Sequence, residues 1–294
     1  MRFGLVGTGH WAKITQAPAL ASLPGSTLSA VWGRNVDAAG ALAAEYGATA
    51  FPDVGVFLDA VDAVAFAVPP NVQAPLAIRA AEAGKHLLLE KPIALDLDDA
   101  DKLVAAVDAS GVASVVFFTL RFSTEIRAWL ADQPPRACWS GGVAVWLGSA
   151  LQPDSPFNTP WRREKGGLWD LGPHVVSLLW ACLGPVTSVS AVAGTADVTH
   201  LVLGHESGAS STATVTLSAP PAASGNNLFV WGEAGRSVMP ATPIDPVQAL
   251  RTAAAELVAS ASTAQPAHPC DVHFGREVLR VLAAAQTQLD AHPA

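Results

Sequence analysis

The chain has 294 residues, enough for two domains; half of them are hydrophobic and 14% are charged. This composition supports a sizeable core and excludes a mainly disordered chain. The formal net charge of −8 argues against nucleic acid and against an anionic membrane surface as partners, because both attract basic patches.

The apolar runs and the cysteines bear on whether the chain is a membrane, secreted or zinc-binding protein. Residues 112–120 form an apolar run, but it stops at Arg121 and is far shorter than the roughly 18 residues that a membrane span needs. Because the first predicted strand follows Met1-Arg2 directly, with no longer apolar segment before it, we expect no signal peptide. Cys138, Cys182 and Cys270 lie far apart and match no zinc spacing. We therefore expect a cytoplasmic protein with reduced thiols and no metal.

The first residues predict a strand that runs into a glycine turn and then a helix. Apolar residues 3–6 precede Gly7-Thr8-Gly9, and Ala12 completes a Gly-x-Gly-x-x-Ala pattern typical of dinucleotide sites. Gly7 permits a tight turn, Gly9 lets a pyrophosphate approach the backbone, and Ala12 lets the helix pack closely. The amides at the start of that helix favour an anion. The alternative is an ordinary strand–turn–helix corner.

Through residue 120, short apolar strands alternate with helices whose apolar residues recur every three or four positions. We predict strands at residues 3–6, 28–32, 63–68, 86–90 and 112–119. We predict helices at residues 12–23, 36–46, 72–83 and 97–110. Asn35 is expected to cap the second helix. This alternation predicts a doubly wound α/β domain over residues 1–120, with a parallel sheet covered on both faces.

From residue 136 onward the pattern changes, because strands now follow one another. We predict strands at residues 136–147, 186–193, 198–206, 209–218 and 227–232. We predict helices at residues 173–183, 246–261 and 272–289. Neighbouring strands predict an antiparallel sheet with one face on a helix and one face open. An open apolar face predicts a homodimer or homotetramer formed through this sheet.

The end of the second strand bears on the choice of dinucleotide. Gly33 occupies the place where NAD-binding proteins usually carry an acid, and Arg34 follows it. An acid repels a 2′-phosphate, whereas an arginine accommodates one. We therefore expect NADP(H) to be preferred, with NAD(H) possible. The alternative is that Arg34 is a solvated residue at a strand end.

Two motifs stand where predicted strands end, at the edge where open parallel sheets bind ligands. They are Pro69-Pro70-Asn71 and Glu90-Lys91-Pro92, the second of which follows three leucines. An ammonium group against an apolar sheet edge suits proton transfer or a hydrogen bond to a reacting oxygen. The alternative for Lys91 is a surface lysine.

A third motif begins the helix predicted at residues 173–183. Gly166-Gly167 precedes Asp170 and His174, whose i, i+4 spacing places both on one helix face. An imidazole exchanges a proton near neutral pH, and an aspartate orients it or holds substrate hydroxyls. The alternative is a capping aspartate and a structural histidine.

Four motifs occur in order along the chain: Gly7-Thr8-Gly9, Glu90-Lys91-Pro92, Gly166-Gly167 with Asp170-x-Gly172-x-His174, and Val230-x-Gly232-x-x-Gly235. Their combination resembles the glucose–fructose oxidoreductase / inositol dehydrogenase / MocA-like (Gfo/Idh/MocA) family over nearly the whole chain. The resemblance implies an N-terminal Rossmann domain and, over residues 121–294, an α/β domain with a large, mostly antiparallel open sheet. A C-terminal helix is expected to pack back toward the first domain.

The resemblance also implies an activity: hydride transfer between a nicotinamide and a sugar, cyclitol or related alcohol or carbonyl. Lys91 would hydrogen-bond the reacting oxygen, His174 would be the acid/base, and Asp170 would hold substrate or tune His174. The family's lysine–proline bond is often cis. A non-catalytic nucleotide-binding sensor on the same fold is the rival function, against which the intact lysine, aspartate and histidine argue.

Together, the patterns and the resemblance define two sets of expected ligand-binding residues. We expect the cofactor to be bound by Gly7, Thr8, Gly9, His10, Trp11, Gly33, Arg34, Asn35, Pro69, Asn71, Glu90 and Lys91. We expect the small-molecule substrate to be bound by Arg121, Trp161, Arg162 and Asp170. The alternative for Trp161-Arg162 is a loop anchor with no ligand role.

Overall fold

The computed structural model describes residues 1–263 and 266–292, and the chain divides into two compact units. The first unit comprises Met1–Ser123 and Ile244–Leu279, and the second comprises Thr124–Pro243 and the chain from Arg280. Among the described residues, no helix has both the length and the hydropathy to span a bilayer.

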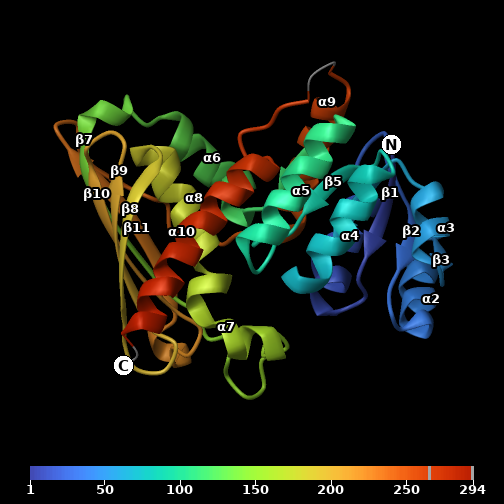
Figure 1. Ribbon diagram of the computed structural model, residues 1–294, viewed down its shortest axis with the longest axis horizontal. Coiled ribbons are helices and arrows are strands. Elements are labelled where there is room, and N and C mark those ends of the chain that lie inside the picture. The colour runs from blue at the N-terminus through green and yellow to red at the C-terminus, as the bar shows by residue number, and fades with distance from the viewer. Residues whose placement is uncertain (264–265, 293–294) are drawn as a thin grey trace. The chain divides into compact units, whose positions relative to one another are not determined.

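A parallel sheet forms the centre of the first unit (Figure 1). Its strands are β1 (Arg2–Val6), β2 (Thr27–Trp32), β3 (Thr49–Phe51), β4 (Ala63–Phe66), β5 (His86–Leu89) and β6 (Ser114–Val116). Their order is β3-β2-β1-β4-β5-β6, and every neighbouring pair is parallel. This is the doubly wound order of a Rossmann fold, so the predicted fold class is confirmed for this unit.

Helices connect and cover these strands. They are the π-helix η1 (Ala12–Gln16), α1 (Ala17–Ala21), α2 (Val36–Glu45), α3 (Val54–Asp59), α4 (Pro70–Glu82), α5 (Leu97–Ser110), the 3₁₀ helix η2 (Thr119–Phe122) and α9 (Pro246–Ala261). α4 packs on α5, while α9 contacts β5, β6 and α1. All four residues of β4 are buried, as expected for a strand covered on both faces. Asn35 caps α2 as predicted, because its Oδ1 accepts a hydrogen bond from the Ala38 amide at 3.0 Å.

Some local predictions for this unit need correction. The helix predicted at residues 12–23 is a π-helix followed by a five-residue α-helix that ends at Ala21. β3 and α3 are not among the predicted elements, because three and six residues are too few to show a periodic pattern.

The second unit contains a mixed sheet. Its strands are β7 (Trp139–Leu147), β8 (Val186–Ala193), β9 (Thr199–His205), β10 (Ser210–Thr216), β11 (Gly225–Gly232) and β12 (Gly235–Val238). Their order is β12-β11-β7-β10-β9-β8, and only the β7–β10 pair among these described strands is parallel. The expectation of a mostly antiparallel sheet is therefore confirmed. The strand predicted at residues 136–147 begins three residues late, because Arg136–Cys138 form the 3₁₀ helix η3.

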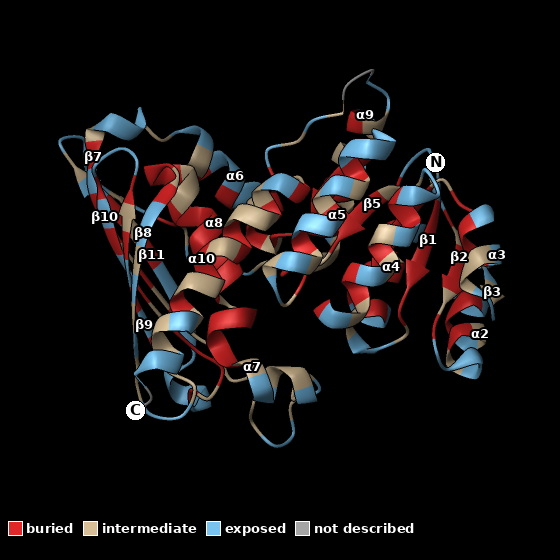
Figure 2. Cartoon of the chain, viewed as in Figure 1, coloured by how far each residue is buried: buried red, intermediate tan, exposed pale blue. Residues whose placement is uncertain are grey.

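Within the part of the chain that the structure describes, helices pack on one face of this sheet. The unit contains α6 (Thr124–Ala131), α7 (Pro160–Asp170), α8 (Gly172–Leu183), the 3₁₀ helix η4 (Pro221–Ala223) and the later part of α10 (Val272–Ala291). α8 is almost entirely buried and packs on β7 and β10 (Figure 2). The opposite face carries exposed apolar side chains: Val192, Val202, Trp231 and Val238, each about half exposed or more. The predicted open face is present.

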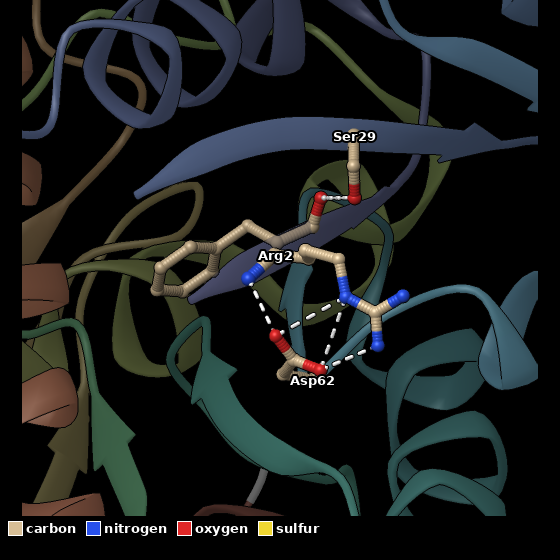
Figure 3. A network of polar contacts seen from close by, with 4 residues as sticks. Arg2, Ser29 and Asp62 are labelled. Carbon is tan, nitrogen blue, oxygen red and sulfur yellow. Dashed lines mark hydrogen bonds and ion pairs between the residues drawn. The ribbon is translucent and has the colours of Figure 1, made fainter. Parts of the chain in front are cut away.

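A polar network joins the amino ends of the first unit's central strands (Figure 3). Arg2 Nη2 lies 2.6 Å from Asp62 Oδ1, and the Arg2 amide donates to Asp62 Oδ2 at 2.8 Å. Ser29 Oγ donates to the Phe3 carbonyl at 3.2 Å. The hydrogen bond from the Arg2 side chain holds the pKa of Asp62 below its usual value. Because this pKa is lower than in the unfolded chain, the carboxylate stabilises the fold above about pH 4, and that stabilisation is lost as the pH falls further.

We expect Asp62→Asn to lower the free energy of unfolding by up to about 1 kcal/mol at pH 7, a small effect because both side chains are about half exposed. Urea unfolding at pH 7 and at pH 3 measures this, and the difference from the unaltered protein narrows at the lower pH. Glu45→Gln, an exposed change on α2, serves as the control. A difference that is as large at pH 3 as at pH 7 contradicts the assignment.

Candidate active site

The turn after β1 requires glycine. Gly7 has φ 121°, its amide donates to the Trp32 carbonyl at 2.9 Å, and a Cβ there would lie 2.5 Å from the Ala67 carbonyl oxygen. At Gly9 a Cβ would meet no atom within 4 Å, so this backbone faces open space. Ala12 is fully buried. A phosphate can therefore approach the turn at Gly9, and these residues fit a dinucleotide.

The end of β2 lies against the same turn. A Cβ at Gly33 would lie 2.8 Å from Thr8 Cγ2, so an acidic side chain at position 33 requires Thr8 to move. Arg34 and Asn35 are exposed beside it, with Asn35 Oδ1 engaged in the α2 cap. The structure thus brings together Thr8, Gly33 and Arg34.

Trp11 and Gln16 connect the glycine turn to Glu90. Trp11 Nε1 donates to Glu90 Oε1 at 2.6 Å, and Gln16 Nε2 donates to the same oxygen at 2.9 Å. Trp11 and Gln16 are five positions apart, at the two ends of the π-helix η1. Because the hydrogen bonds of a π-helix join residues five positions apart, both side chains can reach the same oxygen. Burial raises the pKa of Glu90, although the Lys91 ammonium and the two hydrogen bonds act in the opposite direction.

Gln73 on α4 holds the backbone on both sides of Lys91. Its Nε2 donates to the Glu90 carbonyl at 2.8 Å and to the Pro92 and Ile93 carbonyls, each at 3.3 Å. Its Oε1 accepts from the Glu90 amide at 2.8 Å. Gln73 is fully buried, and it is not among the predicted site residues. Its signal in the sequence is a polar residue on the buried face of a helix, where the other buried residues are Pro70 and alanines.

The other expected residues of this unit lie after the ends of parallel strands or in η2. Pro69 directly precedes α4, and Asn71 is exposed in its first turn; His10 is exposed in the glycine turn. The Lys91–Pro92 peptide bond is cis, as the resemblance predicts. The Arg121 guanidinium in η2 stands over the Phe274 ring, 5.7 Å from its centroid.

In the second unit, an ion pair joins two of the expected substrate residues. Arg162 Nε lies 2.9 Å from Asp170 Oδ2, and both side chains are largely buried. The guanidinium also stands over the Trp161 ring at 4.8 Å and the Phe157 ring at 5.5 Å. Stacking on two rings and pairing with a carboxylate fix the orientation of this cation.

Asp170 ends α7 and His174 lies in the first turn of α8, so their i, i+4 relation spans the join between two helices. The His174 amide donates to the Leu171 carbonyl at 3.1 Å, which continues the helical path through the join. Both Asp170 and His174 are more than nine-tenths buried. Within residues 1–263 and 266–292, no group of three or more His, Cys, Asp or Glu side chains is arranged to hold a metal.

These features define a Rossmann-type dinucleotide-binding unit joined to a unit with an open mixed sheet. Residues 1–118 match the model of the Gfo/Idh/MocA oxidoreductase family, NAD-binding Rossmann fold, and residues 142–238 match the Gfo/Idh/MocA C-terminal domain. The chain belongs to the Gfo/Idh/MocA oxidoreductase family, as its motifs predict.

Two curated relatives and one solved structure illustrate the similarity. UDP-N-acetylglucosamine 3-dehydrogenase of Acidithiobacillus ferrooxidans is 38% identical over 104 residues, 35% of this chain and 32% of that protein. Oxidoreductase P35 of Formosa agariphila is 34% identical over 205 residues, 64% of this chain and 62% of that protein. The aligned regions thus span about a third and about three fifths of these relatives. Levoglucosan dehydrogenase in complex with NADH and levoglucosan shares the fold, with a TM-score of 0.87, 19% identity and coverage of 99% of this chain and 97% of that chain.

We expect Gln73→Leu to lower the free energy of unfolding by about 2–3 kcal/mol, because it leaves the Glu90 amide and buried carbonyls without their partner. Urea unfolding measures the change. Gln248→Leu, the same substitution at an exposed position of α9, is the matched control and has little effect. Equal stabilities of the two variants would show that Gln73 does not hold this turn.

Proposed function

We propose that this chain is an NAD(P)-dependent dehydrogenase or reductase that acts on a CH–OH group of a sugar, cyclitol or related compound. The observation that carries the proposal is the turn containing Lys91. The buried Gln73 side chain makes four hydrogen bonds to the backbone of this turn. The turn follows β5, at the same edge of the sheet as the glycine turn that follows β1. Such support is what a site needs when an ammonium must meet one reacting oxygen.

The first unit supplies the cofactor-binding residues in this proposal. Gly7-Thr8-Gly9, His10 and Trp11 hold the phosphates, and Gly33, Arg34 and Asn35 lie at the adenosine ribose. Pro69, Asn71 and Glu90 shape the nicotinamide end. A bound nicotinamide supplies the hydride acceptor or donor. Lys91 donates a hydrogen bond to the reacting oxygen and stabilises its developing charge.

The second unit supplies the proton and the substrate contacts. His174 takes the hydroxyl proton during oxidation and returns it during reduction. Asp170 orients His174 or accepts hydrogen bonds from substrate hydroxyls. Trp161 and Arg162 are the remaining substrate contacts of this unit, and Arg121 is the substrate contact that the first unit contributes. In domain terms, residues 1–120 bind the nucleotide and residues 121–294 bind substrate and form subunit contacts. The sugar substrates in the names of the relatives support this substrate class.

We expect Lys91→Ala and His174→Ala each to lower kcat by about 10²–10⁴-fold, because each removes a group that acts on the reacting atoms. The cofactor Kd changes little. Cofactor oxidation and reduction over a panel of sugars, cyclitols and small carbonyls measures kcat, and Lys85→Ala, before β5, is the control.

Normal turnover by Lys91→Ala contradicts the catalytic assignment. A protein that binds the nucleotide but turns over none of the panel supports the rival function of a non-catalytic sensor on the same fold.

The cofactor preference is proposed to be NADP(H). Position 33 has no side chain, the methyl group of Thr8 stands against it, and Arg34 is exposed beside it. A carboxylate that would repel a 2′-phosphate is therefore missing from this position, and a cation that attracts one is present.

We expect Arg34→Ala to weaken NADPH binding by about tenfold or more and to leave NADH binding within about twofold, because one charge-assisted contact is lost. Titration of cofactor fluorescence gives both dissociation constants. Arg79→Ala, an exposed change on α4, is the control for loss of positive charge. Equal affinities for the two cofactors before and after the change would leave Arg34 without this role.

Self-association is proposed to use the open face of the second unit's sheet, as a homodimer or homotetramer. Val192, Val202, Trp231 and Val238 expose apolar surface on four of its strands. Association of two such faces removes this surface from water. A monomer in sedimentation at micromolar concentration contradicts it.

A cytoplasmic location accords with Cys138, Cys182 and Cys270, which are all thiols in the described structure.

A further inference from the structure

Asp197 lies between β8 and β9 and accepts four hydrogen bonds. Oδ2 accepts from the Gly167 amide at 2.9 Å and from the Leu217 amide at 2.7 Å. Oδ1 accepts from Thr216 Oγ1 at 2.6 Å and from the Ser218 amide at 3.1 Å. A carboxylate has about four acceptor positions, so this one is saturated by protein groups. Burial raises the pKa of Asp197, but these hydrogen bonds outweigh it and hold the pKa below its usual value.

These bonds join the end of β10 to the glycine pair inside α7. Gly166 interrupts the helix with φ 65° and ψ −165°. A Cβ at Gly166 would lie 3.1 Å from Asp197 Cβ, and a Cβ at Gly167 would lie 2.7 Å from Thr216 Cα. The glycine pair is therefore pressed against both the β10 backbone and Asp197, and neither position accepts a side chain without movement.

The break at Gly166 lies within the proposed substrate site. Arg162 precedes the break and Asp170 follows it, yet the two form an ion pair. After the break, the Leu171 amide donates to the Gly167 carbonyl at 2.8 Å, and the His174 amide donates to the Leu171 carbonyl at 3.1 Å. The helical path from Gly167 to His174 is continuous, so whatever fixes Gly167 also fixes the start of this path.

We propose that Asp197 is a positioning residue for the reaction: through Gly167 it sets where Asp170 and His174 lie. The inference rests on the proposed dehydrogenase function. Asp197 itself touches neither substrate nor cofactor in this proposal. Its carboxylate binds the Gly167 amide, directly after Gly166, where the backbone of α7 leaves the helical conformation.

Three variants test the proposal. Asp197→Ala removes every bond to Gly167, Leu217, Thr216 and Ser218. Asp197→Asn keeps one oxygen for the Gly167 and Leu217 amides, and its amide group can donate to Thr216 Oγ1. It loses the bond from the Ser218 amide, which keeps its 3.1 Å bond to Thr216 Oγ1. Ser211→Ala is the matched control. Ser211 lies on β10 away from the glycine pair, and its loss removes a buried 2.8 Å hydrogen bond to His205 Nε2 on β9.

We expect Asp197→Ala to lower kcat by about 10- to 100-fold, the scale on which misplaced catalytic groups lose rate. We expect Asp197→Asn to restore kcat to within about threefold, and the cofactor Kd to stay within about twofold in both variants. Ser211→Ala lowers Tm by less than Asp197→Ala, because it breaks one buried hydrogen bond and not four, and it leaves kcat within about twofold, because that bond lies away from the glycine pair.

Amide hydrogen exchange gives a readout that needs no turnover. The Leu171 and His174 amides exchange about tenfold faster in Asp197→Ala, and at the unaltered rate in Ser211→Ala. Unchanged exchange or unchanged kcat in Asp197→Ala overturns the proposal, as does an equal loss of kcat in Ser211→Ala. If the unaltered protein turns over no substrate, the dehydrogenase function fails, and the exchange rates still decide whether Asp197 holds these residues.

Discussion

The first unit depends on a contact between two stretches of backbone at Gly7 and Ala67. No side chain fits between them, since a Cβ at Gly7 would lie 2.5 Å from the Ala67 carbonyl oxygen. β1 lies between β2 and β4, and the Gly7 amide also reaches the Trp32 carbonyl at the end of β2. The ends of three central strands therefore meet closely around one glycine, and the residues that follow those strands gather there.

Polar side chains hold two turns that carry candidate site residues, the turn around Lys91 in the first unit and the glycine pair of α7 in the second. Backbone groups in such turns lack the regular partners that helices and sheets provide, and leaving them unpaired in a buried place is costly. Gln73 satisfies four of them around Lys91, and Asp197 satisfies three backbone amides and a hydroxyl around the glycine pair of α7.

The parts of this architecture that are local in sequence could be predicted. The alternation of strands and helices predicts the Rossmann unit, and the cap at Asn35 follows from residue type. Gln73 and Asp197 could not be found in this way, because their backbone partners lie 17 and 30 residues away. Trp11 was recognisable as part of the glycine turn, but its bond to Glu90 joins residues 79 positions apart. β12 has only four residues, too few for alternation to be seen.

The position of α9 has a consequence for biosynthesis. This helix covers β5 and β6 of the first sheet, yet it follows the whole second sheet in the chain. During synthesis the strands of the first unit are therefore translated first, but the unit cannot complete its fold until α9 has been translated. Until then, the apolar surface that Leu250 and Leu257 of α9 help to bury stays exposed. A fragment that stops after the last strand of that sheet would carry the same bare surface permanently.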